Sequence, residues 1–242
     1  MKRIFRRSDT YITADEQLNR IMNALLLCSG LAVIACGTYV GVDSSETNTL
    51  LSLNVLDATN TLFLLSGCLT VIFSIFSCFD VSKPTVLCLF SYVFVIVFVL
   101  QCMVSAVSFA WRVEIEYYAS RELSDFIEKG DDASVSSKTK FAVLNNIQLM
   151  STCCGARGPR DWNSSNWVIR PFLPYSCCSA TVKECSMDKL ENVHSEGCLT
   201  VIIGSYRIYF LMMGLVSLSV SVFQLVFFHA VNYVMFYLKS SL

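Results

Sequence analysis

Residues 85–111 read TVLCLFSYVFVIVFVLQCMVSAVSFAW, a run without any charged side chain. A helix crosses the hydrocarbon core of a bilayer in about 20 apolar residues, so this run alone is long enough to span a membrane. Three further uncharged runs occur, at residues 21–42, 58–79 and 208–238. Because four such runs would leave a soluble domain with almost nothing to cover its core, the sequence predicts an all-α membrane protein with four transmembrane helices.

The composition of the whole chain agrees with this prediction. The 242 residues are 54% hydrophobic and 15% charged, with a mean hydropathy of +0.55, whereas soluble domains average about 25% charged residues. The net charge of -1 gives no indication of a nucleic-acid partner. The chain has only two histidines and contains no phosphate loop, HExxH or CxxC motif. We therefore expect no enzyme, no catalytic residues and no metal site.

The orientation follows from the lysines and arginines beside the spans, which concentrate on the cytoplasmic side of membrane proteins. Those in the N-terminal tail, the connection after the second span and the C-terminal tail all fall on one side, namely Lys2, Arg3, Arg6, Arg7, Arg20, Lys83 and Lys239. Residues 43–57, on the other side, contain none. We expect both termini to be cytoplasmic. The first 20 residues lack an apolar stretch with a cleavage site, so the first span is expected to act as a signal anchor.

This orientation predicts the layout of the chain. It comprises a cytoplasmic tail at 1–20, spans at 21–42, 58–79, 85–111 and 208–231, a short outer loop at 43–57, an inner loop at 80–84, a large outer loop at 112–207 and a cytoplasmic tail at 232–242. Within the large loop, residues 111–128 and 141–150 have helical apolar patterns. We expect residues 190–207 to return as a helix into the fourth span.

The twelve cysteines fall into two classes. Six lie in or beside the spans, and six lie in the large loop. A loop that matures in an oxidising compartment is expected to form disulfides rather than bind zinc, and six cysteines allow 15 pairings. Adjacent cysteines are poorly placed to bond each other, because consecutive alpha carbons are about 3.8 Å apart and disulfides favour about 5.5 Å. Cys153 and Cys154, like Cys177 and Cys178, should therefore reach distant partners.

Three short motifs hold these cysteines: Cys153-Cys154-Gly155, the PYSCC run at 174–178, and Glu196-Gly197-Cys198. Together they resemble the signature of the tetraspanins, in which CCG, PxSC and a final GC precede the fourth span. The resemblance covers essentially the whole chain, since the order of spans and loops also fits. It implies three disulfides, Cys153–Cys198, Cys154–Cys177 and Cys178–Cys185.

The resemblance also implies a function, that of a non-catalytic membrane organiser. Such a protein would bind partner membrane proteins laterally through residues 156–189 and cluster with itself and other tetraspanins, in the plasma membrane or endosomal membranes. Four aromatic residues of this stretch are candidate partner-binding residues: Trp162, Trp167, Phe172 and Tyr175. Aromatic side chains are frequent interface anchors, although these four could equally form a small core beneath the disulfides.

Other four-span classes fit less well. A membrane-shaping homo-oligomer, like the peripherin-like branch of the same family, would normally need an unpaired outer cysteine, and the even count of six argues against one. Claudin-like proteins have the large loop first, and connexin-like proteins need cysteines in both outer loops, whereas residues 43–57 have none. The homo-oligomer remains the alternative to the organiser.

Small residues recur at a spacing of seven in the first two spans. The first span carries Asn23, Gly30 and Gly37, and the second carries Asn60, Gly67 and Ser74. Small residues on one face let two helices approach closely, where dispersion supplies the attraction. The pattern therefore predicts a tightly packed antiparallel pair.

Three amide side chains, Asn23, Gln101 and Gln224, lie within the predicted spans. Polar residues in hydrocarbon are costly and normally face other helices or a cavity. Tetraspanins carry polar residues at these positions, and in some members they line a pocket for a sterol such as cholesterol. Two roles stay open here, a structural one between helices and a sterol-binding one, and no other cofactor is expected.

Several residues are candidates for modification or targeting. Cys78 and Cys88 lie at the cytoplasmic ends of the second and third spans, where tetraspanins are typically palmitoylated. Asn163 begins the only N-glycosylation sequon, in the large outer loop. The C-terminal residues SSL and the YVMF run at 233–236 match a PDZ-binding and a sorting pattern, and the sequence does not settle whether either is used.

Overall fold

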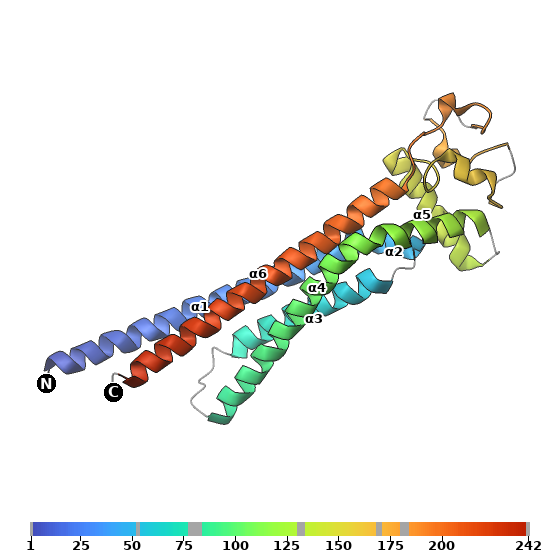
Figure 1. Ribbon diagram of the computed structural model, residues 1–242. Helices are drawn as coiled ribbons and strands as arrows, with labels where there is room; N and C mark the ends of the chain where they lie inside the picture. The colour runs from blue at the N-terminus through green and yellow to red at the C-terminus, as the bar shows by residue number, and fades with distance from the viewer. Residues whose placement is uncertain are drawn as a thin grey trace. The chain divides into compact units, whose positions relative to one another are not determined.

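The computed structural model describes residues 2–51, 54–76, 84–129, 134–167, 171–179 and 184–240. Within these ranges, six α-helices and three short 3-10 helices follow one another (Figure 1). They are α1 (Lys2–Asp43), α2 (Ser45–Leu51), α3 (Asn54–Phe76), α4 (Pro84–Lys129), α5 (Val135–Ser151), η1 (Pro159–Asn163), η2 (Tyr175–Cys177), η3 (Leu190–Asn192) and α6 (Leu199–Ser240). The described ranges contain no strand beyond two isolated bridges. The predicted all-α class is confirmed.

Four of these helices are long and apolar enough to cross a membrane, counted over the described residues. The segments that meet these criteria are Asn23–Asp43, Asn54–Phe76, Tyr92–Lys129 and Leu199–His229. Each lies within one of the four long helices, α1, α3, α4 and α6. Each also overlaps one of the four uncharged runs of the sequence, which confirms the prediction of four spans.

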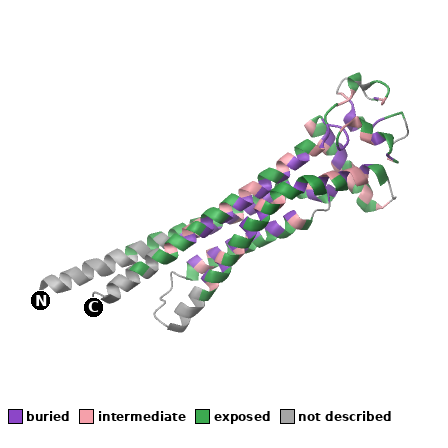
Figure 2. Cartoon of the chain, in the orientation of Figure 1, coloured by how far each residue is buried: buried purple, intermediate pink, exposed green. Residues whose placement is uncertain are grey.

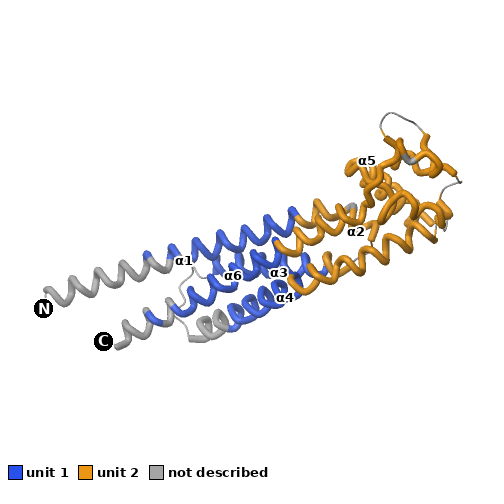
Figure 3. Tube along the Cα trace, turned by 45° about the horizontal axis from the view of Figure 1, so that its top comes forward, with its two compact units in different colours: residues 1–39, 58–108, 212–242 blue, residues 40–57, 109–211 orange. Residues whose placement is uncertain are grey.

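The chain divides into two compact units, which are coloured separately in Figure 3. Unit 1 consists of residues 1–39, 58–108 and 212–242 and holds most of the apolar length of the four long helices. Unit 2 consists of residues 40–57 and 109–211 and holds both loops. The helices α4 and α6 therefore contribute extensive segments to both units, whereas α1 only ends in unit 2, at Asp43, and α3 only begins there, at Asn54.

Within unit 1, α1 and α3 pack at close range through small residues. A Cβ atom on Gly30 would lie 2.8 Å from a methyl of Val71, and one on Gly67 would lie 2.8 Å from a methyl of Val33. Such distances leave no room for a side chain, so the two backbones are as close as glycine allows. The hydroxyl of Ser74 also donates to the carbonyl oxygen of Asn23 at 2.7 Å. The predicted tight pair is confirmed.

The other helices of unit 1 are joined by polar contacts inside an apolar bundle. Ser105 on α4 donates to the carbonyl oxygen of Gly214 on α6 at 3.2 Å. Along each described helix, buried residues alternate with exposed ones, as Figure 2 shows. The exposed faces carry large apolar side chains, among them Leu31, Val95 and Val226. These faces suit contact with lipid, since apolar surface of this kind is costly in water.

In unit 2, α4 continues without a break to Lys129, as the pattern at 111–128 predicted. The helix predicted at 141–150 is present and longer, because Ser134 caps the start of α5 by accepting a hydrogen bond from the backbone N–H of Ser137 at 3.0 Å. Thr152 ends α5 in the left-handed conformation, with φ of 50°.

The prediction of a helix over 190–207 was wrong in its first half. Only η3 forms there, and α6 begins at Leu199. The backbone N–H groups of Cys198 and Leu199 donate to the carbonyl oxygens of Gly155 and Ala156, both at 3.0 Å. These bonds hold the chain against the CCG segment, so a regular helix starts only after the cysteine.

Candidate partner-binding surface

Three disulfides hold the large loop together. They join Cys153 to Cys198, Cys154 to Cys177, and Cys178 to Cys185, across 45, 23 and 7 residues of sequence. These are the pairs that the resemblance implied. Closing the longer loops removes conformational entropy from the unfolded chain, and the effect grows with loop length. Two of the disulfides start from neighbouring residues, so they converge on one point at the end of α5.

Glycines make this convergence possible. Gly155 has φ of +68°, and a Cβ atom there would lie 2.2 Å from the carbonyl oxygen of Gly158. A Cβ atom on Gly197 would lie 2.3 Å from the carbonyl oxygen of Ala156. The first glycine is needed for its backbone conformation and the second for its close approach. The CCG and GC motifs therefore pack against each other. The backbone N–H of Cys154 donates to the backbone carbonyl oxygen of Glu196 at 2.8 Å.

The serine of the PxSC motif joins η2 to α5. Ser176 is fully buried, and its hydroxyl oxygen lies 2.6 Å from the amide oxygens of both Asn145 and Gln148. A hydroxyl has one proton and donates to one of them at a time. The sequence reasoning missed this contact, because it treated the motif only as a source of cysteines. The signal was a small hydroxyl residue next to two cysteines that bond to distant partners.

The two tryptophans of residues 156–189 belong to the core of the loop. Trp162 is fully buried and meets Phe141 edge-on, with ring centroids 6.2 Å apart. Trp167 stacks on Phe141 at 4.5 Å and donates from its indole nitrogen to the carbonyl oxygen of Phe126 at 3.1 Å. Trp162 is therefore corrected from a candidate partner-binding residue to a core residue. Trp167 is half-buried and has its ring engaged by α4 and α5.

Phe172 and Tyr175 differ from the tryptophans, because 50% and 61% of their surfaces are exposed. With Leu173, Glu184 and Cys185 they line a hollow of about 350 Å³. We call these five residues the aromatic surface. Two restraints fix its backbone. The backbone N–H of Leu173 donates to the backbone carbonyl oxygen of Cys185 at 3.1 Å. Tyr175 begins η2, which ends at Cys177 in the disulfide with Cys154. Rigid, exposed aromatics lose little entropy on binding and can anchor a protein partner.

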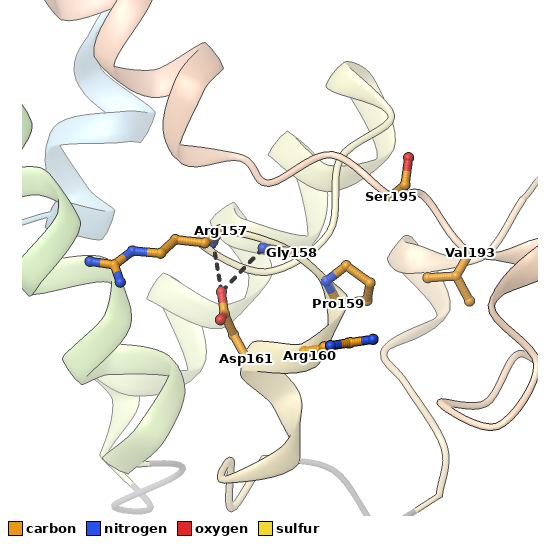
Figure 4. A pocket seen from close by; sticks show the side chains of 7 residues that line it. All are labelled: Arg157, Gly158, Pro159, Arg160, Asp161, Val193 and Ser195. Atoms are coloured by element: carbon orange, nitrogen blue, oxygen red, sulfur yellow. Dashed lines mark hydrogen bonds between the residues drawn. The ribbon is translucent and has the colours of Figure 1, made fainter.

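A second hollow, of about 420 Å³, lies beside η1 (Figure 4). Its lining, here called the η1 pocket, is Arg157, Gly158, Pro159, Arg160, Asp161, Val193 and Ser195. The carboxylate of Asp161 accepts hydrogen bonds from the backbone N–H groups of Arg157 at 2.6 Å and Gly158 at 3.3 Å. These bonds fix the turn that leads into η1. In Figure 4 the guanidinium of Arg157 points away from Val193 and Ser195, whereas Arg160 extends beside Pro159.

A polar network in unit 2 connects the short loop to the start of α6. Tyr206 is buried and donates to the amide oxygen of Asn48 at 2.5 Å, while the amide nitrogen of Asn48 donates to Asp57 at 2.6 Å. The hydroxyl of Tyr209 donates to the carboxylate of Asp43. The helix α2, which carries Asn48, also packs against α5. The sequence analysis did not find this network, because its partners Asn48 and Tyr206 are far apart in the chain.

The three amides of the spans, Asn23, Gln101 and Gln224, are all buried within unit 1. Gln101 donates to the hydroxyl of Thr70 on α3 at 3.4 Å. Among the described residues, the side-chain oxygens of Gln101 and Gln224 accept no hydrogen bond. The contact between Gln101 and Thr70 links α3 to α4, in keeping with a structural role.

The candidate modification sites are only partly described. Cys78 lies outside the described residues, and Cys88 lies in α4 with its side chain outside them. Asn163 is the last residue of η1 and is exposed. The last two residues of the SSL pattern lie outside the described part, whereas Tyr233 is exposed in α6. Within the described residues, no group of His, Cys, Asp and Glu side chains could hold a metal ion.

Comparison with known proteins identifies the family of this chain. The model of the tetraspanin family matches residues 17–236. The chain belongs to the tetraspanin family. Tetraspanin-6 of Bos taurus is 25% identical over 89% of this chain and 86% of its own length. Tetraspanin-1 of Rattus norvegicus is 25% identical over 85% of this chain and 89% of its own length. The CD151 antigen of Mus musculus is 23% identical over 84% of this chain and 83% of its own length.

As a tetraspanin, the chain is an integral membrane protein that crosses the bilayer several times. Members of the family are generally structural or scaffold proteins rather than enzymes, and its homologues associate with other membrane proteins. Membership therefore supports a scaffold-type role in the membrane.

Proposed function

We propose that this tetraspanin binds partner membrane proteins laterally through its large loop and clusters them in tetraspanin-type microdomains. The observation that carries the proposal is the aromatic surface, where Phe172 and Tyr175 are exposed on a backbone held by disulfides. A partner that buries these rings gains apolar contact area, and little loop entropy is lost on binding. The proposal has both termini in the cytoplasm and the large loop outside the cytoplasm, in the plasma membrane or endosomal membranes.

Co-purification tests this role. The full-length protein is purified in a mild detergent after crosslinking, and the bound proteins are quantified by mass spectrometry. We expect a stoichiometric membrane protein, crosslinked within residues 156–189. The double variant Phe172→Ser and Tyr175→Ser should reduce its recovery by about 30-fold or more, because the loss of even one interface hot spot costs about 2 kcal/mol or more.

A matched control separates specific binding from general stickiness. Val135 and Met150 on α5 are apolar and more exposed than the aromatic surface, at 82% and 81%. Replacing both by serine should leave recovery unchanged. Equal losses in the two double variants would contradict a role for the aromatic surface. Recovery of the chain only with itself, in discrete oligomers, would favour the membrane-shaping alternative.

Two lipid-related roles belong to the same proposal. Acylation of Cys78 and Cys88 would hold the protein in clusters, and the variant Cys78→Ser with Cys88→Ser should lose acyl label.

A sterol such as cholesterol would place its hydroxyl as a donor to the amide oxygens of Gln101 or Gln224, which accept no hydrogen bond from the described residues. Photoactivatable sterol should then crosslink less to a Gln224→Leu variant, and an unchanged yield would reject the pocket.

A further inference from the structure

The η1 pocket lies beside the glycosylation sequon, and no role has yet been assigned to it. Asn163 ends η1 and is exposed, while Arg160 lies three residues earlier in the same 3-10 helix. A 3-10 helix has three residues per turn, so side chains at i and i+3 lie directly above one another. One turn rises about 6 Å, at 2.0 Å per residue. A group attached to Asn163 therefore starts within one sugar's reach of Arg160.

The lining of the η1 pocket suits a sugar. Pro159 and Val193 offer apolar surface to the C–H face of a pyranose ring, and Arg160 and Ser195 offer donors to its hydroxyl and acetamide oxygens. Arg160 is exposed, and its guanidinium has no ion-pair partner within 4 Å among the described residues. Its five N–H donors are thus available to a ligand. The turn that shapes the pocket is rigid, because the carboxylate of Asp161 binds its backbone.

We propose that the η1 pocket seats the first sugars of an N-linked glycan on Asn163. The transfer forms a bond between the side-chain nitrogen of Asn163 and C1 of N-acetylglucosamine. It breaks the bond from C1 to the pyrophosphate of a lipid-linked oligosaccharide, and the amide loses one proton while the lipid pyrophosphate leaves. The inference rests on the outward orientation of the large loop in the proposed function.

The order of events follows from Ser165, the hydroxyl residue of the sequon. Ser165 is buried, and its hydroxyl accepts a hydrogen bond from the backbone N–H of Trp167 at 3.2 Å. A transferase that reads this hydroxyl must act before residues 162–167 fold. The glycan then settles on the η1 pocket as the loop closes. Because the pocket shares no residue with the aromatic surface, the glycan covers one hollow of the loop and leaves the other for partners.

Arginine-specific labelling tests the seating on the full-length protein, purified without partners in lipid nanodiscs. Phenylglyoxal reacts with exposed guanidinium groups, and mass spectrometry reports the rate at each arginine. In the glycosylated protein we expect Arg160 to react about tenfold more slowly than in the Asn163→Gln variant, the ratio expected for one charge-assisted hydrogen bond. Arg121, an exposed arginine of α4 that does not line the η1 pocket, is the internal control and should react equally in both.

A second measurement keeps the test independent of the Asn163 substitution. Peptide N-glycosidase should release the glycan from the native Arg160→Ala variant several-fold faster than from the wild type, and the Arg121→Ala variant, changed outside the pocket, should match the wild type. Equal labelling of Arg160 with and without Asn163, or an intact mass without glycan at Asn163, would overturn the proposal. Since no partner is present, a failure of the partner-binding proposal would leave these results unchanged.

Discussion

The two units of this tetraspanin are held together by different means. In unit 1, helices meet through glycines such as Gly30 and Gly67, and no disulfide joins the described residues of this unit. In unit 2, three disulfides and buried hydrogen bonds act together with an apolar core that includes Leu123, Leu144 and Trp162. Lipid offers no hydrophobic drive between helices, so close packing must supply the attraction. In water, the burial of apolar side chains drives packing, and disulfides add stability by restricting the unfolded chain.

The largest expected effect is the loss of the disulfide that closes the longest loop. Replacing Cys153 and Cys198 by serine should destabilise unit 2 by about 4 kcal/mol, the chain-entropy value for a loop of this length. Replacing Cys178 and Cys185, which close 7 residues, should cost about 2 kcal/mol. Limited proteolysis of the large loop over a temperature series measures both. Equal losses in the two variants would contradict loop closure as the source of stability.

A smaller effect is expected where the backbones of unit 1 approach. In the Gly67→Ala variant the new methyl would lie 2.8 Å from Val33, so the helices must separate, at a cost of up to about 3 kcal/mol. Gly204→Ala in α6 is the control, because its new methyl meets nothing within 4 Å. Thermal unfolding in detergent compares the two variants. If Gly67→Ala melts at the temperature of Gly204→Ala, close approach does not stabilise unit 1.

The hydrogen bonds of the short loop should contribute less to stability than the Cys153–Cys198 disulfide or the close packing at Gly67. Asn48→Ala leaves the buried hydroxyl of Tyr206 without its acceptor and removes the hydrogen bond from Asn48 to Asp57, which should cost about 2 kcal/mol. Hydrogen exchange of α2 is the measurement, and Thr49→Ala, at an exposed neighbouring position, is the control. Unchanged protection of α2 in Asn48→Ala would show that the network does not hold the short loop.

The smallest effect is expected for a buried amide of unit 1. Gln101→Leu removes one weak donor at 3.4 Å together with an oxygen that accepts nothing from the described residues. Thr70 keeps its own bond to the carbonyl oxygen of Ser66 at 2.8 Å. Stability should therefore change by less than about 1 kcal/mol. A loss above about 2 kcal/mol in detergent unfolding would show that polar bonds, rather than close packing, hold unit 1.

The sequence predicted unit 1 better than unit 2, for physical reasons. Charge-free runs identify spans because the hydrocarbon excludes charge along the whole length of a helix. The seven-residue spacing of small residues around Gly30 in α1 and around Gly67 in α3 was likewise visible, since a helix face repeats about every seven residues. In both cases the signal is local in the chain, so no knowledge of distant contacts was needed.

The contacts of unit 2 are long-range, and sequence patterns do not show them. The partners Asn48 and Tyr206 lie 158 residues apart, and Ser176 lies 31 residues from Asn145. The composition of residues 156–189 left open which aromatics are buried, and only the packing of Phe141 against both tryptophans decides it. The disulfide pairing came from the family resemblance, because spacing alone left many pairings open.

Site-specific photocrosslinking in intact membranes tests the central claim, that unit 2 presents the aromatic surface to a lateral partner. A photoreactive amino acid replaces Tyr175 in one variant and Met150, on α5 of the same unit, in another. The account predicts one discrete heterologous adduct from position 175, lost when Phe172 is changed to serine, and none from position 150. The same adduct from both positions, or only adducts between copies of this chain, would contradict it.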